Sequence, residues 1–578
     1  MKRLFSAGVS VLLVLGIAAQ VSSVQNKTEY RKAMEYLENG NEVYFRFFNT
    51  QRTLLDELTH IISLDNVKNS NEVYAYANTA EFTKFLEYGL YYEVCTHPGD
   101  ITDGVVMGTP DKVRQSWDSY PDISGYYEIM EDFASEYPDK CRIYQYGTSI
   151  RGRKLLYAII SDNVNEDEPE PRVMYTSAMH GDETVMYVNF LRLIDYLLSN
   201  YESDDYVKYL VDNVEIWICP LENPDGTYNG TDASVSNARR YNANGVDLNR
   251  NYPRAGEKNT DECRPLVEKE AQAVCDLVDS LHFVVSMNVH GGAELLNYPY
   301  DYRSRLHADD EWMKYVYRKY ANTVHAVNPN YLNDQNNGIT NGYQWYQIFG
   351  SRMDYHTYFQ NCREVTAEFS STKLVPANSL PNYWNYQKQA LLEYIEEALF
   401  GINGTVTCAM SGVPLEAKIE VVGHDEENTY TYTEKEHGDF WRPINKGTYT
   451  LKITADDYLM KTIEDVSVEN DKATVLDIKL DPATPINHEI GELVHSASLK
   501  IMPAVNGQVT ISHALAGNTG IALYDLSGRQ VRSFDCSPKS SVVWDGRDLS
   551  GNPVGNGCYL IRLTNSNKSM TKSFILSR

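Results

Sequence analysis

Long hydrophobic runs are nearly absent from this 578-residue sequence, and the single one lies at its start. Lys2 and Arg3 precede an apolar run over residues 9–19, and small residues follow as far as Ser23. The run is too short to span a bilayer, and its flanks are typical of a cleavable signal peptide rather than of a buried first helix. We therefore predict a signal peptide at 1–23 and an exported, soluble mature chain without a transmembrane segment.

Basic side chains are scarce relative to acidic ones. The 52 Lys and Arg residues face 79 Asp and Glu residues, which gives a formal net charge of −27. Such a charge repels phosphate backbones and anionic membrane surfaces, so no nucleic acid is expected as a partner, and cationic substrates are mildly favoured. The 42% of hydrophobic residues describes a folded chain and excludes global disorder.

Cysteines are few and scattered, and no fixed-period repeat or low-complexity tract is present. The nine cysteines could pair in an exported chain, with one left over. Their spacing does not determine the bridges, and plain buried thiols are an equal alternative. We therefore predict no specific disulfide.

The chain is too long for one hydrophobic core, since a domain typically holds about 100–200 residues. Residues 25–110 mix strand-like and helix-like patterns and predict a small α+β domain. From 115 to 400, apolar strands such as 173–178 and 283–289 alternate with long amphipathic helices, which predicts an α/β domain with a mixed central sheet flanked by helices. In such sheets, functional groups collect at the carboxyl ends of the strands.

After residue 400 no long helical pattern recurs. Residues 401–482 break into short alternating strands with frequent turn signals and predict a small antiparallel β-sandwich. A polar linker at 483–497 leads to a last strand-rich unit at 498–578, for which we predict a second β-sandwich.

Two histidines and a glutamate stand at strand ends in the α/β segment. An apolar strand ends in His180 and Glu183 as a His-x-x-Glu motif and is expected to run straight into a helix, and His290 closes the strand at 283–289. Imidazole and carboxylate ligands suit a catalytic zinc, which needs three protein ligands and a fourth open position. An isolated His-x-x-Glu is usually an ordinary surface pair, so the predicted zinc site depends on both histidines lying at strand ends.

The stretch from 240 to 253 carries two arginines and several amides in a turn-rich context. Arg240 and Arg250 suit an anion, because a guanidinium matches a carboxylate with two parallel bonds, although a solvated loop is the alternative. A later strand carries Glu364 and Glu368 in an apolar setting, where either could also be an ordinary surface residue.

Together these motifs resemble one family, the zinc metallocarboxypeptidases of the funnelin type, or family M14. The resemblance spans nearly the whole 115–400 segment and is specific, because separated motifs occur in the family's order. Residues 401–480 are similar to the transthyretin-like domain that follows the catalytic domain in the regulatory N/E branch. The matching positions are His180-x-x-Glu183, Asn-Pro-Asp-Gly at 223–226, Arg240, Asp247-x-Asn249-Arg250, His290-Gly291-Gly292, Trp345-Tyr346 and Glu368.

The resemblance implies a metal centre with one supporting residue. His180, Glu183 and His290 would bind one Zn²⁺ in the catalytic domain. Asp247 would accept a hydrogen bond from His180 and so fix its tautomer.

The resemblance also implies the catalytic groups and the substrate clamp. Glu368 would act as general base and then as general acid on a zinc-activated water, and Arg240 would stabilise the oxyanion. Asn249, Arg250 and Tyr346 would hold and cover the terminal carboxylate of the substrate. This clamp explains exopeptidase action, since an internal peptide bond supplies no carboxylate.

Two positions bear on specificity. In the N/E branch, an aspartate eleven residues after the third zinc ligand lies in the pocket for basic side chains, and Asp301 has that offset. Fifteen residues before the general base, where this branch commonly has glutamine, the sequence has Met353, which with Phe349 could admit an apolar side chain. We expect release of C-terminal Lys or Arg, with apolar C-termini and peptidoglycan stem peptides as alternatives.

The flanking segments also have family counterparts. Residues 25–110 lie where many secreted members carry a prodomain, so an inhibitory or folding role is one hypothesis and a permanent accessory domain is the other. Residues 498–578 resemble the sorting tag of type IX secretion systems in Gram-negative bacteria, with an immunoglobulin-like spacer as the alternative. The tag implies secretion machinery as a partner and a secreted or cell-surface bacterial protein.

The expected function is therefore that of a secreted zinc carboxypeptidase acting on the C-termini of peptides or proteins. A catalytically silent binding protein on the same scaffold is the rival hypothesis. The complete ligand set and the presence of Glu368 argue against it, because inert relatives typically lose a ligand or the general base.

Overall fold

The computed structural model describes residues 27–483 except 41, 49–50, 69–71 and 255–266, together with 499–576 except 506–507, 514–518, 526–528, 538–539, 556 and 565–568. It divides into two compact units, Met1–Ala483 and Thr484–Arg578. The predicted signal peptide and all but the first residue of the predicted linker lie outside the described residues.

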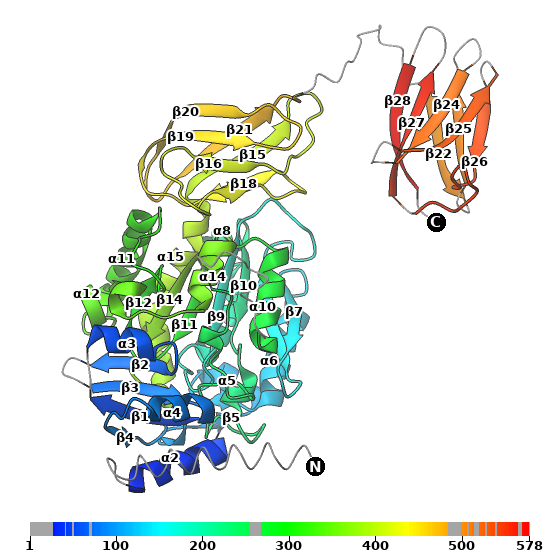
Figure 1. The fold of residues 1–578 in the computed structure, drawn as a ribbon. Coiled ribbons are helices and arrows are strands. Elements are labelled where there is room, and N and C mark those ends of the chain that lie inside the picture. The colour runs from blue at the N-terminus through cyan, green and yellow to red at the C-terminus, as the bar shows by residue number, and fades with distance from the viewer. Residues whose placement is uncertain are drawn as a thin grey trace. The chain divides into compact units, whose positions relative to one another are not determined.

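A mixed eight-stranded sheet forms the centre of the first unit, in the order β13-β12-β14-β11-β9-β10-β8-β7 (Figure 1). Strands β14, β11, β9 and β10 run parallel, while β8, β7 and β12 pair antiparallel with their inner neighbours. The predicted mixed α/β sheet is thereby confirmed. The strands are β7 (Cys141–Thr148), β8 (Lys154–Ile160), β9 (Arg172–Ser177), β10 (Glu215–Cys219), β11 (Val285–His290), β12 (Glu294–Tyr298), β13 (Ile339–Asn341) and β14 (Arg363–Phe369).

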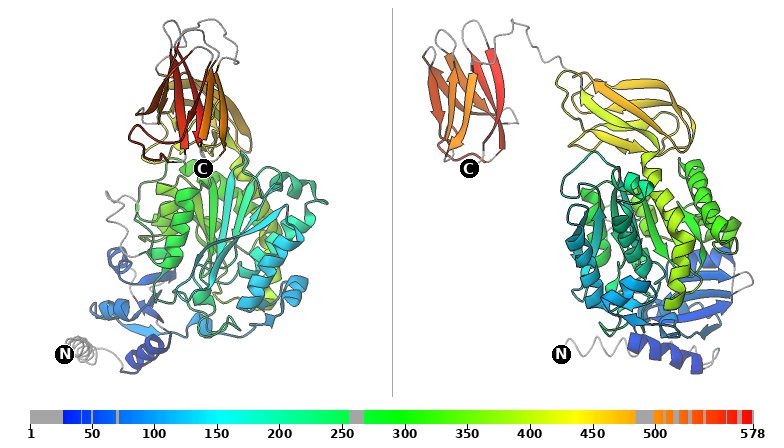
Figure 2. Two further views of the ribbon diagram at one scale, coloured as in Figure 1. Left: turned by 90° about the vertical axis from the view of Figure 1, so that its right-hand side faces the viewer. Right: turned by 180° about the vertical axis from the view of Figure 1, so that it is seen from behind.

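Helices cover both faces of this sheet (Figure 2). Strands β9 and β11 are buried along their whole length, as apolar runs require in a sheet that is covered on both sides. One hydrophobic cluster packs α6 (Ile123–Glu136), α7 (Tyr187–Asn200), α8 (Asp205–Val211), α11 (Asp310–Val327) and α15 (Leu380–Glu396) against the sheet. A second cluster includes residues of α10 (Lys269–Ser280) and α14 (Arg352–Phe359).

The N-terminal segment folds as a small α+β domain with its own core. Its antiparallel sheet has the order β2-β3-β1-β4, and Asn78 and Glu81 form a capping box at the start of its third helix. Met107 and Tyr120 already pack with the α/β core, so the separate core ends before them. The elements are α2 (Lys27–Gly40), β1 (Val43–Phe48), α3 (Arg52–Leu58), β2 (Ser63–Lys68), β3 (Glu72–Ala77), α4 (Thr79–Leu86) and β4 (Tyr92–Val94).

Two β-sandwiches complete the described chain, as predicted. The first pairs sheet β18-β15-β21 with sheet β17-β16-β19-β20, and the second pairs β22-β23-β26 with β25-β24-β27-β28. The first comprises β15 (Gly401–Cys408), β16 (Lys418–Val421), β17 (Thr431–Tyr432), β18 (Asp439–Arg442), β19 (Gly447–Thr454), β20 (Lys461–Val468) and β21 (Ala473–Leu480). The second comprises β22 (Leu499–Val505), β23 (Gln508–His513), β24 (Thr519–Tyr524), β25 (Gln530–Cys536), β26 (Ser541–Trp544), β27 (Gly557–Thr564) and β28 (Ser569–Leu576).

Two local expectations differ from the structure. The first sandwich is not wholly antiparallel, because its first and last strands, β15 and β21, pair in parallel; the intervening strands supply the long crossover that a parallel pair needs. The motif strand β9 does not continue directly into a helix, because Ala178 turns the chain with φ +56° and α7 begins only at Tyr187.

Within the described ranges, Cys95, Cys141, Cys219, Cys362, Cys408 and Cys536 are free thiols. Within the described ranges, no helix combines the length and apolar composition needed to cross a membrane.

Candidate active site

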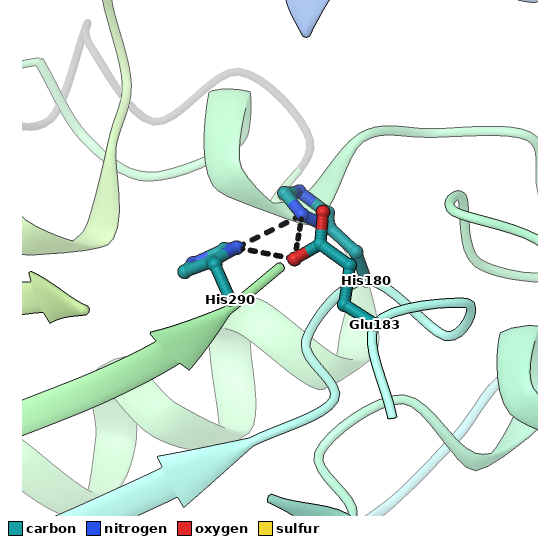
Figure 3. Close-up of side chains that lie close together, drawn as sticks. All are labelled: His180, Glu183 and His290. Atoms are coloured by element: carbon teal, nitrogen blue, oxygen red, sulfur yellow. Dashed lines mark hydrogen bonds and ion pairs between the residues drawn. The ribbon is translucent and has the colours of Figure 1, made fainter. Parts of the chain in front are cut away.

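Three side chains converge at the carboxyl ends of β9 and β11. His180 and Glu183 lie in the turn after β9, and His290 is the last residue of the parallel neighbour β11. The two Nδ1 atoms are 3.0 Å apart, and Oε2 of Glu183 lies 3.0 Å from Nδ1 of His180 and 2.8 Å from Nδ1 of His290 (Figure 3). All three side chains are buried.

This trio fits a zinc ion. Its nitrogen and oxygen atoms are spaced close to the roughly 3.3 Å that separates ligands around a tetrahedral zinc with bonds of about 2.0–2.1 Å. Nε2 of His180 lies 3.0 Å from Oδ1 of Asp247, an arrangement that keeps the His180 proton on Nε2 and the Nδ1 lone pair toward the other ligands. The amide of Asn288 lies 2.9 Å from Nε2 of His290 and fixes the second ring.

Arg240 joins the metal trio to Asp247. Its Nε donates to Oδ2 of Asp247 at 3.1 Å, and its Nη1 donates to Oε1 of Glu183 at 3.1 Å. Burial alone would raise the pKa of Asp247, yet the charges of Arg240 and His180 hold that pKa well below its ordinary value. Asp247 therefore stays ionised and orients both His180 and Arg240.

Glu368 lies on β14 directly opposite His290 in the parallel register. Its burial, reinforced by the negative charge of Glu183, raises its pKa to about 8. Its Oε2 is buried and has no hydrogen-bond partner among the residues that the structure describes. A carboxyl group that titrates near neutrality and has a free oxygen is suited to proton transfer.

The residues expected to hold a carboxylate line the same cavity. Asn249 and Arg250 follow Asp247 in a 3₁₀ turn, where the Asp247 side chain accepts from the backbone N–H of Asn249. Tyr346 follows the short helix α13 (Gly342–Trp345) and also lines the cavity. The structure thus brings this predicted clamp beside the metal trio.

Asp301 lines the catalytic cavity, whereas Met353 lies behind the cavity wall. Asp301 lines the cavity, and burial raises its pKa above the ordinary value. Met353 is fully buried in α14, with its sulfur 3.7 Å from the hydroxyl of Thr366, and Thr366 rather than Met353 faces the cavity. Phe349 stacks on His60 instead, at 4.3 Å between ring centroids.

The small N-terminal domain enters this site. Lys373 Nζ donates to Oδ1 of Asp65 at 2.5 Å and to Oε1 of Glu183 at 2.7 Å. Arg250 Nη2 lies 3.5 Å from the backbone oxygen of Leu64. Two of the cations that line the cavity, Lys373 and Arg250, are therefore engaged by residues of strand β2.

A second contact of that domain supports the Arg240 segment. The backbone N–H groups of Arg240 and Tyr241 each donate to the carboxylate of Glu42 at 2.8 Å, and Glu42 lies 2.7 Å from Nε2 of His97. Tyr76 packs under the Arg240 guanidinium at 5.2 Å from its ring centroid.

Sequence reasoning missed Lys373, Asp65 and Glu42. Lys373 had no local signal, because it follows a polar stretch and its carboxylate partners, Asp65 and Glu183, are distant in the sequence. Asp65 and Glu42 had none, because their roles depend on how one domain docks on another.

The chain matches three known domain families. Residues 126–390 match the Zinc carboxypeptidase family, and residues 401–481 match the Carboxypeptidase regulatory-like domain. Residues 503–577 match the Secretion system C-terminal sorting domain, which indicates a secreted or cell-surface bacterial protein.

Curated relatives match more than half of the chain. The chain is 33% identical over 365 residues to carboxypeptidase M of Mus musculus, covering 59% of this chain and 80% of that protein. It is 32% identical over 391 residues to the carboxypeptidase N catalytic chain of Rattus norvegicus, covering 61% and 84%. It is also 33% identical over 407 residues to carboxypeptidase D of Drosophila melanogaster, covering 65% of this chain but spanning only 29% of that longer protein.

Proposed function

The chain belongs to the zinc carboxypeptidase family, and from that premise we propose that it hydrolyses the C-terminal peptide bond of peptides or proteins and releases single basic residues. The observation that carries this proposal is one cavity lined by the metal trio, Glu368, Arg240 and the Asn249–Arg250 pair. Hydrolysis of a C-terminal peptide bond by this chemistry needs metal ligands, a base and a group that binds the terminal carboxylate. Residues suited to all three tasks line this one cavity.

The reaction requires a proton to move from water to the leaving amine. Zinc held by His180, Glu183 and His290 would supply the Lewis acidity that makes water nucleophilic near neutral pH. Glu368 accepts the proton of the attacking water and then donates it to the amine nitrogen as the C–N bond breaks. Arg240, oriented by Asp247, stabilises the negative charge that develops on the carbonyl oxygen.

Chain-end specificity follows from the clamp. Arg250 presents a planar fork and Asn249 an amide beside it, so both can bind the terminal carboxylate. Tyr346 lines the same cavity and would cover the bound carboxylate. An internal residue offers no carboxylate to Arg250, so we expect single-residue release from the C-terminus.

Preference for a basic side chain is supported by Asp301. A buried carboxyl group that lines the cavity gains from a cationic partner, because burial otherwise disfavours its charged form. The net charge of −27 adds a weak long-range attraction for basic peptides.

We further propose that residues 27–94 hold the enzyme in a closed form. Asp65 forms an ion pair with Lys373, and the backbone oxygen of Leu64 accepts a hydrogen bond from Arg250. A substrate that enters the cavity must therefore displace both contacts. A protease site engineered at the exposed turn of residues 102–104 tests this. Cleavage should raise the rate, whereas an unchanged or lower rate would favour a permanent accessory domain, as the Glu42 support of Arg240 would require.

The C-terminal unit is proposed to act as an export tag read by secretion machinery. Deleting residues 484–578 removes one compact unit and leaves the other intact. The truncated protein should stay within the cell envelope of its bacterial host, and continued export would contradict the role.

The main test measures residue release from matched peptides that end in Lys, Arg, Phe and D-Ala, with and without a zinc chelator. Chelator-sensitive release of Lys or Arg supports the proposal. Release of Phe alone would indicate that the substrates have apolar C-termini. Release of D-Ala alone would indicate peptidoglycan stem peptides as substrates. No release from any peptide, even after cleavage at 102–104, would favour a silent binding protein.

A further inference from the structure

The backbone of Arg240 is held by a carboxylate from the small N-terminal domain. Glu42, between α2 and β1, is fully buried. Its Oε1 accepts from the N–H of Arg240 and its Oε2 from the N–H of Tyr241, each at 2.8 Å. Nδ1 of His97 accepts from the N–H of Gly99 at 3.0 Å, so the ring proton lies on Nε2 and is donated to Oε1 of Glu42 at 2.7 Å. Both carboxylate oxygens are thereby fixed in place, and the chain at Arg240 is fixed with them.

The small domain also packs against the Arg240 guanidinium. Tyr76 of β3 is fully buried, and its ring centroid lies 5.2 Å from the guanidinium carbon. Its hydroxyl donates to Oδ2 of Asp182 at 3.0 Å, which keeps the ring from turning away. An aromatic face attracts a cation, so Tyr76 limits the movement of the guanidinium. Asp247 and Glu183 bond its N–H groups, so the two domains together hold this side chain.

We propose that the small domain is a working part of the catalytic centre, in which Glu42 and Tyr76 position Arg240 to stabilise the oxyanion. This inference rests on the proposed carboxypeptidase function. A donor stabilises a transition state best when it already lies where the negative charge develops, because it then needs no reorganisation during the reaction. Glu42 fixes the backbone of Arg240 and Tyr76 restrains its side chain, so both act through Arg240 and are positioning residues.

This role is compatible with the closed form, because the two sets of contacts come from different strands. The sheet of the small domain has the order β2-β3-β1-β4, so β1 and β3 are interior strands and β2 is an edge strand. Glu42 directly precedes β1 and Tyr76 lies on β3, whereas the contacts that close the cavity come from β2. An edge strand is bonded to one neighbour only, so it can shift while the interior strands stay docked. Cleavage at 102–104 is therefore expected to raise the rate only while the small domain stays bound.

The main test is Glu42→Gln in the full chain, assayed on the peptide that the wild type hydrolyses fastest. An amide has a single acceptor oxygen, so the N–H of Arg240 or that of Tyr241 loses its partner. We expect kcat to fall by about tenfold with KM within about twofold of wild type, because Arg240 acts in the transition state and small misplacements are costly there. Glu93→Gln, which breaks the partly exposed pair with Arg46 in the same domain, is the matched control and should leave kcat unchanged. A wild-type kcat in Glu42→Gln would overturn the inference.

A double-mutant cycle separates the positioning of Arg240 from a general loss of structure. In Arg240→Ala the positioned group is gone, so adding Glu42→Gln should lower kcat further by less than about twofold. A loss of structure would instead lower kcat by the same factor in both backgrounds, and that result would overturn the inference. Bound zinc should stay close to wild type in all four proteins, since neither Glu42 nor Arg240 is one of the three proposed ligands.

A second position covers the case in which Glu42→Gln does not fold. Tyr76→Leu removes the aromatic ring and should lower kcat several-fold, whereas Tyr76→Phe keeps the ring and should stay closer to wild type. Tyr91→Leu, at an exposed tyrosine of the same domain, is the matched control and should leave kcat unchanged. Equal kcat values in Tyr76→Leu and wild type would overturn the inference. Absence of release by the wild type from every peptide would instead contradict the proposed function.

Discussion

Strands β9 and β14 carry a packed domain at each end, and the two ends are built differently. At their carboxyl ends, the small domain inserts Asp65 beside Lys373 in a cavity. At their amino ends, the first β-sandwich contacts Arg172 and Arg363, the first residues of the two strands. Arg172 donates to Glu434 at 3.1 Å, and Arg363 donates to the backbone oxygen of Thr429 at 3.0 Å.

The difference lies in how completely the buried carboxylates are bonded. Both oxygens of Asp309 at the amino end are used, since Arg442 donates to each at 2.9 and 3.0 Å and Arg363 adds a bond of 2.7 Å. At the carboxyl end, Oε2 of Glu368 has no partner within the described ranges. A fully bonded buried charge locks two domains together, whereas an incompletely bonded one remains available for chemistry.

The largest effect should come from the carboxyl end of β14. Replacing Glu368 with Gln keeps the shape but removes the proton acceptor, so kcat should fall by about 10²–10⁴-fold, the usual contribution of a positioned general base. The Tm and the bound zinc content should stay close to wild type, because Glu368 is not one of the three proposed ligands. Rates within a factor of ten of wild type would remove Glu368 from the mechanism.

At the amino ends of the strands, we expect a substitution to lower the stability of the fold and to leave the activity unchanged. Asp309→Asn removes the carboxylate that pairs with buried Arg363 and leaves buried Arg442 with Asp425 alone, which should cost about 3–5 kcal/mol in the free energy of unfolding. Urea denaturation measures this loss, and kcat/KM at 25 °C should be unchanged. Asp471→Asn, which removes the partly exposed partner of Lys319, is the control and should cost less than about 1 kcal/mol. A loss of activity in Asp309→Asn would show that the two ends are coupled.

The sequence was sufficient to predict features that depend on a local pattern of residues, such as buried strands and the functional residues at their ends. The apolar strands β9 and β11 are recognisable because strands buried on both faces read as continuous hydrophobic runs. His180, Glu183 and His290 could be proposed because each follows or ends such a strand, where parallel neighbours bring functional groups together. Their detailed roles, and that of Asp301, came from family resemblance rather than from spacing.

Features that depend on docking between distant segments could not be predicted. Asp65 and Lys373 are 308 residues apart and meet only because the small domain covers the cavity. Met353 was expected beside the substrate, but helix periodicity places it behind Thr366. The parallel pairing of β15 with β21 likewise depends on how the sandwich closes, which alternation within single strands does not encode.

Removing the Asp65–Lys373 ion pair tests whether this pair holds the small domain over the catalytic cavity. Asp65→Asn removes the ion pair while keeping a similar shape, so kcat/KM for a Lys-ended peptide should rise by about tenfold if a charge-assisted bond of about 1.5–3 kcal/mol holds the domain in place. Steady-state kinetics on the full chain provides the measurement. Asp56→Asn, which breaks the exposed pair with Arg52 in the same domain, is the matched control and should have no effect. A fall in the rate would assign Asp65 to substrate binding instead.

The smallest effect concerns Asp301, whose charge the proposed substrate needs. Burial raises its pKa, and the neighbouring negative charge of Glu364 acts in the same direction, while Arg250 opposes it. Asp354, also buried and with a raised pKa, bonds the backbone N–H of Asp301. On acidification, Asp301 should therefore take up a proton at a higher pH than an ordinary aspartate and lose its attraction for an ammonium group.

KM for a Lys-ended peptide should consequently rise by about threefold as the pH falls from 7.5 until Asp301 is protonated, while KM for a Leu-ended peptide stays level. Measuring both KM values across this range separates Asp301 from Glu368, because loss of the general base would lower kcat for both peptides. In Asp301→Asn the difference between the two profiles should vanish. A KM for the Lys-ended peptide that does not change with pH would mean that the ammonium group of the substrate is not bound by Asp301.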